Sequence, residues 1–368
     1  MTTIEFRRAL HRRPELSFEE HETQQFIIDA LNSEGISNRA IAGTGVLAVI
    51  EGKRGNHQSA VVLRADIDAL PIEEQNDIEY RSQNRGVMHA CGHDMHAAVL
   101  FGVLQSLNRE RDFEGTLFGI FQPGEELNPG GASLVIKEEP FNGYNVAAVI
   151  GEHVDARLEV GEVGICPGQF MASNDELRFK ITGKGGHAAR RAEINDTVTA
   201  MADMVMRTTA LNSPDGVVSI GRMIAEGATN VIPNTVTAEG TMRTFKQQER
   251  ERIYTHIHSN ARLVAEKYGV EVDVDINRGY PCVVNDVLLS YEAMIIAADE
   301  DITVRELQPM TTAEDFGFYT ELYPSLFYRL GVGSSAGGSH TATFCPDEAA
   351  LEVGERMMRR MALHILNK

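Results

Sequence analysis

Short apolar segments alternate with a segment of helical spacing in the first 150 residues of the chain. Residues 46–50, 60–64, 116–121 and 146–150 are apolar and have the length of strands, which is typical of strands buried within a sheet. Residues 94–108 instead repeat their apolar positions at the spacing of one helix face. This alternation predicts an α/β domain with a mixed, largely parallel sheet and helices on both faces.

Two helix starts are predicted ahead of these strands. Thr2 and Thr3 can cap a first helix, which Pro14 would stop. Ser17 followed three residues later by Glu20 forms a capping-box pattern, so we expect a second helix to begin there.

The middle of the chain has a different order of predicted strands and helices. Its strand-like and helix-like segments are, in order, 176–182, 195–211, 217–224, 236–245, 248–268 and 270–277. The order β-α-β-β-α-β is typical of a ferredoxin-like α+β domain. The α/β rhythm resumes afterwards, so we expect a larger domain formed by residues 1–168 and 282–368, with a smaller domain inserted at 169–281.

Charge and composition exclude several classes of function. The 368 residues include 34 Lys and Arg against 53 Asp and Glu, a formal net charge of −19. Such a surface repels nucleic-acid backbones and anionic lipids, so neither partner is expected. No apolar run has the length of a membrane helix or of a signal sequence, and the four cysteines form no CxxC pair. We therefore expect a soluble, cytoplasmic protein without a disulfide framework.

Metal-binding side chains gather in four short segments, at 88–94, 122–126, 151–153 and 338–340. Loops at the carboxyl ends of parallel strands converge on one crevice, so these segments are expected to meet. Their candidate ligands are Cys91, His93, Glu126, His153 and His340. This donor mixture suits zinc, manganese or cobalt, and five donors exceed one tetrahedral site, which favours two neighbouring metal ions. Taken alone, a His or Cys is more often a packed core residue than a metal ligand, and adjacent glutamates are common on solvated helix faces.

Seven motifs then follow one another from one end of the chain to the other. They occupy residues 11–17 (HRRPELS), 63–71 (LRADIDALP), 88–98 (MHACGHDMHAA), 121–126 (FQPGEE), 183–189 (GKGGHAA), 230–234 (NVIPN) and 314–316 (EDF). As a set, they resemble the M20 metallopeptidase superfamily, and within it the amidohydrolase branch that includes hippurate hydrolases and auxin-conjugate hydrolases.

This resemblance implies a catalytic domain with two divalent metal ions (zinc, manganese, cobalt or nickel) and an inserted lid domain through which relatives form homodimers. Carried over by position, the five residues named above are the metal ligands, and Cys91 is the one expected to bridge the two ions. Glu125 is expected to be the general base. His187 is expected to stabilise the oxyanion, from its own subunit or from a partner.

Further residues are expected to lie around the metal ligands or to bind the substrate. Asp68 is expected to orient a ligand histidine, and Glu314 to lie close to the metals. Asn230 and Arg243 are candidates for binding a substrate carboxylate, although loop hydrogen bonding or a surface ion pair explains them equally well. Glu152 departs from the apolar residue usual in relatives, and we expect it near the substrate path.

The predicted activity is metal-dependent hydrolysis of the amide bond of an N-acyl amino acid or a similar small amide. A dipeptidase or aminopeptidase of the same superfamily is the nearest alternative, and it would require a free α-amine on its substrate. A non-catalytic metal-binding relative is a second alternative, but it would have no need of Glu125 beside the ligands. A cysteine hydrolase using Cys91 with His93 is a third.

Overall fold

A computed structural model describes all residues, 1–368, and the chain divides into two compact units. The large unit comprises Met1–Phe170, Val284–Pro309 and Asp315–Lys368, and the small unit comprises Met171–Val283 and Met310–Glu314. The last of these segments, which the sequence analysis placed in the larger domain, belongs with the small unit because Met310 forms a parallel bridge with Met171.

The large unit is built on an eight-stranded sheet with the order β1-β2-β4-β3-β5-β16-β6-β15. Its four central strands, β4 (Thr116–Gln122), β3 (Ser59–Asp66), β5 (Asn145–Asp155) and β16 (Ser325–Gly331), are parallel to one another. The outer strands are β1 (Ser37–Ile41), β2 (Gly45–Glu51), β6 (Glu162–Ile165) and β15 (Thr303–Glu306), and β1, β2 and β6 each have an antiparallel pairing. The mixed, largely parallel α/β sheet predicted from the sequence is therefore confirmed.

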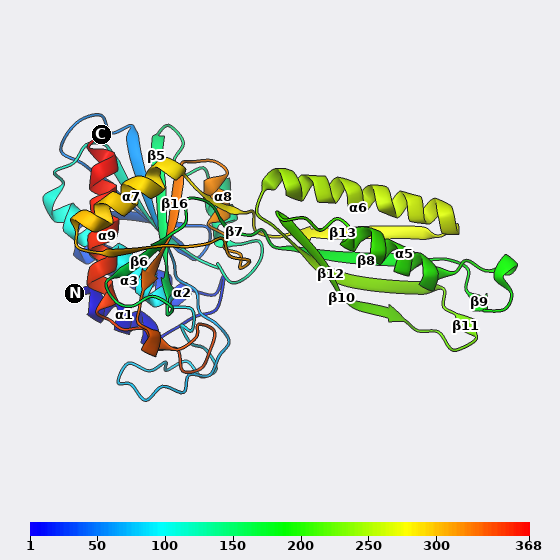
Figure 1. Cartoon of the computed structure of the whole chain (residues 1–368). Coiled ribbons are helices and arrows are strands. Elements are labelled where there is room, and N and C mark those ends of the chain that lie inside the picture. The colour runs from blue at the N-terminus through cyan, green and yellow to red at the C-terminus, as the bar shows by residue number, and fades with distance from the viewer. The chain divides into compact units, whose positions relative to one another are not determined.

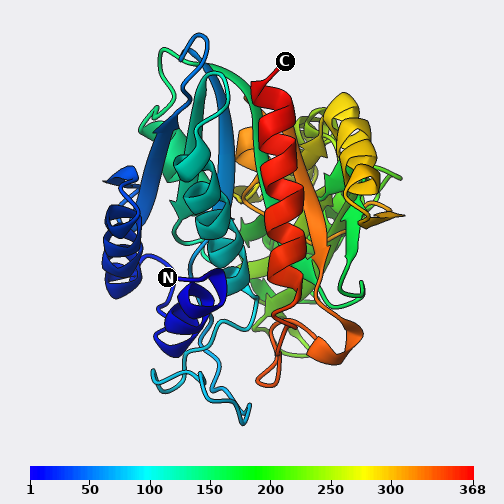
Figure 2. The same ribbon diagram turned by 90° about the vertical axis from the view of Figure 1, so that its left-hand side faces the viewer.

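Helices pack on this sheet in two groups. One group consists of α1 (Thr3–Arg12), α3 (His93–Glu110), α9 (Ala350–Leu366) and α7 (Val287–Asp299), which contact one another in that order. The second group contains α4 (Gly131–Lys137) and α8 (Gly317–Thr320), which contact each other and the strands β4 and β16. In Figure 2, α9 and α3 lie side by side across the sheet, where α3 contributes an almost continuous run of buried apolar residues to the core.

The two predicted helix starts had different outcomes. Thr2 caps α1 through a capping box with Glu5, and the helix ends at Arg12, before Pro14. The predicted start at Ser17 is wrong, because α2 (His21–Ser33) begins four residues later and has no side-chain cap from Glu20. The carboxylate of Glu15 instead accepts hydrogen bonds from the first backbone N–H groups of that helix.

The small unit is a four-stranded antiparallel sheet with two helices (Figure 1). In chain order it contains β8 (Asp175–Thr182), α5 (Thr197–Thr209), β10 (Gly216–Ala225), β12 (Thr235–Thr244), α6 (Gln247–Tyr268) and β13 (Glu271–Arg278). Alternate residues of β8 are buried against the helices, so one face of the sheet forms the core. The sheet order β10-β12-β8-β13 is that of the expected ferredoxin-like unit.

The remaining short elements complete the chain. They are β7 (Gly168–Met171), β9 (Gly186–His187), η1 (Arg191–Glu193), β11 (Val231–Ile232), β14 (Val283–Asn285) and η2 (Ser334–Ala336). None of the helices combines the length and apolar character needed to cross a bilayer.

Candidate metal centre

The candidate ligands lie where the parallel strands of the large unit end. His153 is near the end of β5, Glu126 follows β4, and His340 lies in the loop after β16. Cys91 comes from the segment between β3 and α3, and His93 is the first residue of α3, where Gly92 turns the chain with a φ of 88°. Parallel strands present their carboxyl ends at one edge, so segments far apart in sequence meet there.

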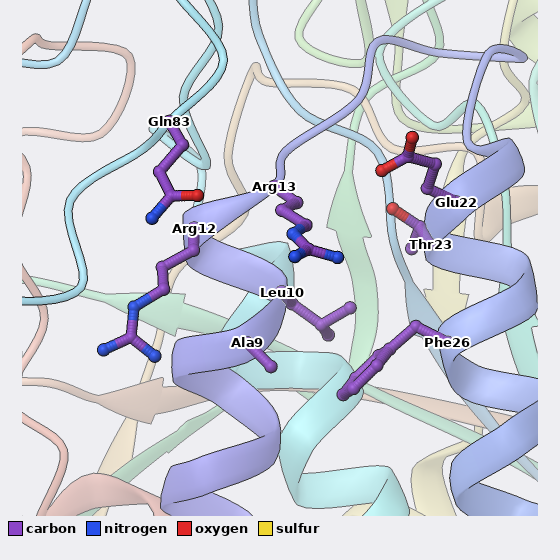
Figure 3. A pocket seen from close by; sticks show the side chains of 8 residues that line it. All are labelled: Ala9, Leu10, Arg12, Arg13, Glu22, Thr23, Phe26 and Gln83. Carbon is purple, nitrogen blue, oxygen red and sulfur yellow. The ribbon is translucent and has the colours of Figure 1, made fainter.

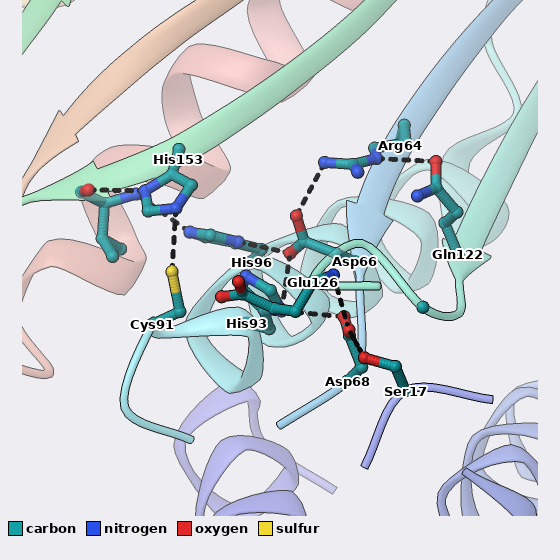
Figure 4. A network of polar contacts seen from close by, with 12 residues as sticks. Ser17, Arg64, Asp66, Asp68, Cys91, His93, His96, Gln122, Glu126 and His153 are labelled. Atoms are coloured by element: carbon teal, nitrogen blue, oxygen red, sulfur yellow. Dashed lines mark hydrogen bonds and ion pairs between the residues drawn. The ribbon is translucent and has the colours of Figure 1, made fainter. Parts of the chain in front are cut away.

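The structure brings all five predicted ligands together in two groups that share Cys91. The donor atoms of Cys91, His93 and His153 lie within 4.8 Å of one another, as do those of Cys91, Glu126 and His340. Cys91 Sγ is 3.2 Å from Nε2 of His153 and 3.2 Å from Nε2 of His340 (Figure 4 shows the first contact). His340 Nε2 is also 3.2 Å from a carboxylate oxygen of Glu126.

His93 is aimed into this cluster by Asp68. Its Nδ1 lies 3.0 Å from Asp68 Oδ1, while its buried Nε2 has no hydrogen-bond partner. The other carboxylate oxygen of Asp68 accepts hydrogen bonds from the Ser17 hydroxyl and from the backbone N–H of Glu126 (Figure 4). A metal-ligating histidine usually has this arrangement, in which one ring nitrogen contacts a carboxylate and the other is left for the metal.

The other two histidines are held by the backbone. His153 Nδ1 lies 2.7 Å from the carbonyl oxygen of Val154, which leaves Nε2 facing Cys91. His340 has a φ of 62°, in the left-handed region, and its backbone N–H donates to the carbonyl oxygen of Ala90. The loop after β16 is therefore tied directly to the loop that carries Cys91.

A second layer of buried polar groups supports this edge of the sheet. His96 has both ring nitrogens engaged, Nδ1 at 2.6 Å from Asp66 and Nε2 accepting from the backbone N–H of Val154. The Asp66 carboxylate also accepts from Arg64, whose guanidinium reaches Gln122 and Asp315 as well. The ligand atoms of Asp66, His93 and His96 also lie within 4.8 Å of one another, but those of Asp66 and His96 already have partners within the protein.

Burial and charge shift the pKa values in this cluster. Burial raises the pKa of the Cys91 thiol to about 12, although His93 acts in the opposite direction. Burial also lowers the pKa of His153, with a further contribution from the charge of Arg329. Without a cation the thiol is therefore protonated at neutral pH, whereas coordination to a divalent metal deprotonates such a thiol outright. Three imidazoles and one carboxylate lie around the sulfur of Cys91, which both groups share, and this donor set fits divalent transition-metal ions.

The predicted general base is placed beside the ligands. Glu125 is buried, and its carboxylate lies within 4.8 Å of the donor atoms of His93 and Glu126. His89 is buried as well, and neither of its ring nitrogens has a hydrogen-bond partner. Burial lowers the pKa of His89 to about 4, so this ring is neutral. Glu314 is buried directly before Asp315, the carboxylate that binds Arg64.

The remaining predicted site residues belong to the small unit. His187 is exposed on β9, and the backbone N–H of Ala189 donates to its Nδ1. Asn230 is exposed, and its backbone carbonyl oxygen accepts a hydrogen bond from the backbone N–H of Ala188 in the same β9–β11 region. Arg243 lies on β12, where partial burial lowers its pKa.

The sequence analysis expected Glu152 near the substrate path, and this expectation is wrong. It is fully buried within the sheet, where Tyr328 on the neighbouring β16 donates a 2.5 Å hydrogen bond to its carboxyl group. Burial raises its pKa to about 8, so the side chain is uncharged at neutral pH. Alternation along β5 explains the placement, because residues 152 and 153 point to opposite faces of the sheet.

Sequence comparison identifies the family of this fold and site. Residues 62–364 match the model of peptidase family M20/M25/M40. The chain is 36% identical to an N-acetylcysteine deacetylase of Bacillus subtilis (strain 168), over 99% of this chain and 96% of that protein. It is 35% identical to an N-acetyldiaminopimelate deacetylase of Exiguobacterium sibiricum, over 95% of each chain.

Solved structures give the same result. A dinuclear metal-binding peptidase of the M20 family from Bacillus subtilis superposes with a TM-score of 0.87, at 34% identity over 99% of this chain and 97% of that one. The matched region contains the whole set of converging Cys, His and Glu donors described above. This chain thus belongs to peptidase family M20/M25/M40 and is a metal-dependent amidohydrolase.

Proposed function

We propose that the protein hydrolyses the amide bond of N-acyl amino acids with short acyl groups, releasing a carboxylate and a free amino acid. The observation that carries this proposal is the convergence of five donors in two groups sharing Cys91, with the buried carboxylate of Glu125 beside them. The deacetylase relatives, which match this chain over nearly its full length, support an acetyl group as the acyl part.

Two divalent cations fit the five donors. Cys91, His93 and His153 would hold one, Cys91, Glu126 and His340 would hold the other, and the Cys91 thiolate would bridge them. Zinc, manganese, cobalt and nickel all suit this donor set. When bound, such ions lower the pKa of water and polarise a carbonyl group.

The protein residues supply the proton transfers and the binding of the substrate. Glu125 would accept a proton from the attacking water and deliver it to the leaving nitrogen as the amide bond breaks. The exposed ring of His187 would donate a hydrogen bond to the oxygen of the tetrahedral intermediate. Asn230 and Arg243 would bind the substrate carboxylate, the guanidinium through two parallel hydrogen bonds.

A cysteine hydrolase is a weaker explanation of the same site. The nucleophile in such enzymes is a thiolate in an exposed, electropositive setting. Cys91 is buried, and burial raises the pKa of its thiol to about 12. Its sulfur contacts Nε2 of His153 and of His340, the ring nitrogens proposed to bind the metal ions.

The test is amine release from N-acetyl, N-benzoyl and N-succinyl amino acids by chelator-treated protein resupplied with zinc or manganese. We expect release to require metal, to favour N-acetyl substrates, and to be lost in Glu125→Gln while metal binding is retained. Full activity in that variant would contradict the role of Glu125. Hydrolysis of unblocked dipeptides alone would instead support a peptidase.

We also propose that the protein forms a homodimer through the small unit. Strand β10 lies at the edge of its sheet and exposes Val217 and Met223, and α5 exposes Met206. An unpaired edge strand with apolar side chains is a ready site for association with a second copy. Val217→Lys should yield a monomer in light scattering, whereas Leu288→Lys, a matched change on the exposed surface of α7, should leave the dimer intact.

A further inference from the structure

A small cavity lies between α1 and α2, outside the cluster of metal ligands. Its volume is about 280 Å³, and Figure 3 shows it between the last turn of α1 and the first turns of α2, with Gln83 approaching from a separate loop. Leu10 and Phe26 form an apolar floor. This volume is just below the usual range of about 300–1,000 Å³ for ligand pockets, which restricts an occupant to the size of a single amino acid.

Opposite charges stand at two sides of this cavity. The guanidinium of Arg13 points into the space between the helices and forms no ion pair, and Arg12 has only a 3.9 Å approach to the exposed Glu79. The carboxylate of Glu22 faces the cavity from α2 and is not within ion-pair distance of either arginine. A single ligand that carries both a negative and a positive group could therefore pair with an arginine and with Glu22 at the same time.

A buried hydroxyl group lies between these charges. Thr23 is 3% exposed, and its Oγ1 has no hydrogen-bond partner. Its backbone N–H is already used by Glu15, so only the side chain remains to be satisfied. In Figure 3 this hydroxyl points toward the space beside Arg13. Buried hydroxyl groups normally have a partner, and a polar ligand in the cavity would supply one.

We propose that this cavity binds a free α-amino acid with an apolar side chain. Its carboxylate would pair with Arg13, its ammonium group with Glu22, and its side chain would lie on Leu10 and Phe26. A phosphate or another simple anion would leave Glu22 unpaired and repelled, and an N-acyl amino acid lacks the ammonium group. The ligand belongs to the product class of the proposed reaction, and that link alone rests on the proposed function.

The experiment is calorimetric titration of the full-length protein with L-leucine, which needs no hydrolytic activity. Wild type, Arg13→Ala, Glu22→Gln and the control Arg85→Ala are compared; Arg85 is an exposed arginine on the same loop as Gln83 that does not line the cavity. We expect millimolar binding by wild type and Arg85→Ala, and at least tenfold weaker binding by the other two variants.

Two analogues test the assigned contacts. Leucinamide lacks the carboxylate, so its binding should be weak and insensitive to Arg13→Ala; N-acetylleucine lacks the ammonium group, so any binding should be insensitive to Glu22→Gln. No binding of leucine by wild type, or equal binding by all four proteins, would overturn the proposal. Equal binding would place leucine elsewhere, including the metal centre. Since amide hydrolysis is measured separately, failure here does not affect the proposed function.

Discussion

Asp68 holds two of the candidate metal ligands, and replacing it with asparagine tests that arrangement. One carboxylate oxygen faces Nδ1 of His93 at 3.0 Å, and the other accepts from Ser17 and from the backbone N–H of Glu126. In Asp68→Asn the side-chain NH₂ must face a donor in either orientation. If it faces His93, the imidazole has to move its proton to Nε2, and that nitrogen can then no longer bind a metal.

The expected magnitude follows from these contacts. Hydrogen bonds to a charged acceptor contribute about 1.5–3 kcal/mol each, and loss of a carboxylate behind a ligand histidine weakens metal binding roughly 10–100-fold. Because asparagine opposes the ligand tautomer as well as removing the charge, we expect a loss near 100-fold, or about 2.7 kcal/mol. The matched change Ser17→Ala removes one donor to Asp68 and leaves His93 untouched, so we expect only about a threefold loss.

The assay is competition between the protein and a chromophoric chelator for zinc or manganese, followed by hydrolysis of an N-acetyl amino acid at saturating metal. Thermal unfolding of the metal-free variants checks that they remain folded. Metal affinity of Asp68→Asn within threefold of wild type would refute the reasoning. So would equal losses in Asp68→Asn and Ser17→Ala, since the contact with His93 would then carry no weight.

Two further predictions concern stability, and a third concerns the metal centre. Burial lowers the pKa of His11, but its contacts with Asp94 and Glu74 outweigh this effect and raise the pKa to about 9. Protonated His11 therefore contributes up to roughly 3 kcal/mol to the free energy of unfolding, in full below about pH 6.5, and this contribution is lost as the pH rises through 9. Urea unfolding at a series of pH values should show this decline, and His11→Asn should flatten it. Arg250 binds the fully buried Asp175 through two hydrogen bonds, so Arg250→Met should lower the free energy of unfolding by about 3–5 kcal/mol. Arg252→Ala, at a partly exposed ion pair with Glu249, should cost less than about 1 kcal/mol, and similar losses in the two variants would contradict the assignment. Gly92 has a φ of 88°, and a Cβ there would lie 2.6 Å from Val154, so Gly92→Ala should displace His93 and reduce metal-restored activity, while Gly143→Ala, with a similar φ and open space, should retain it.

The sequence predicted those features that local pattern determines. The central strands β3, β4 and β16 are buried along almost their whole length because helices cover both faces of the sheet, and the apolar runs within them are visible without a structure. The candidate ligands could be predicted for a related reason. They follow strand ends, and parallel strands bring such positions together wherever they occur in the chain.

Features that depend on distant partners could not be predicted. Ser17 and Glu20 have the spacing of a capping box, but Ser17 donates to Asp68, a residue 51 positions away, and Glu15 caps the helix. Arg64 and Asp315 form a buried pair 251 residues apart, and neither residue carries a local signal of the other. Glu152 was expected near the substrate path because its neighbour His153 is a candidate ligand, but the period of two along a strand places Glu152 on the opposite face of the sheet.

The same long-range contacts explain how the donor set keeps its geometry. His93 is held by a carboxylate from the β3 end, His153 by the neighbouring peptide, and His340 by a backbone bond to the loop of Cys91. Each histidine is thus fixed through a different contact, and the contacts of His93 and His153 are made by Nδ1, which leaves Nε2 toward the cluster. Because these constraints are independent, the loss of one should loosen one ligand and leave the others placed. Metal affinity should therefore fall stepwise as the supporting contacts are removed, whereas a site held by one shared contact would fail at once.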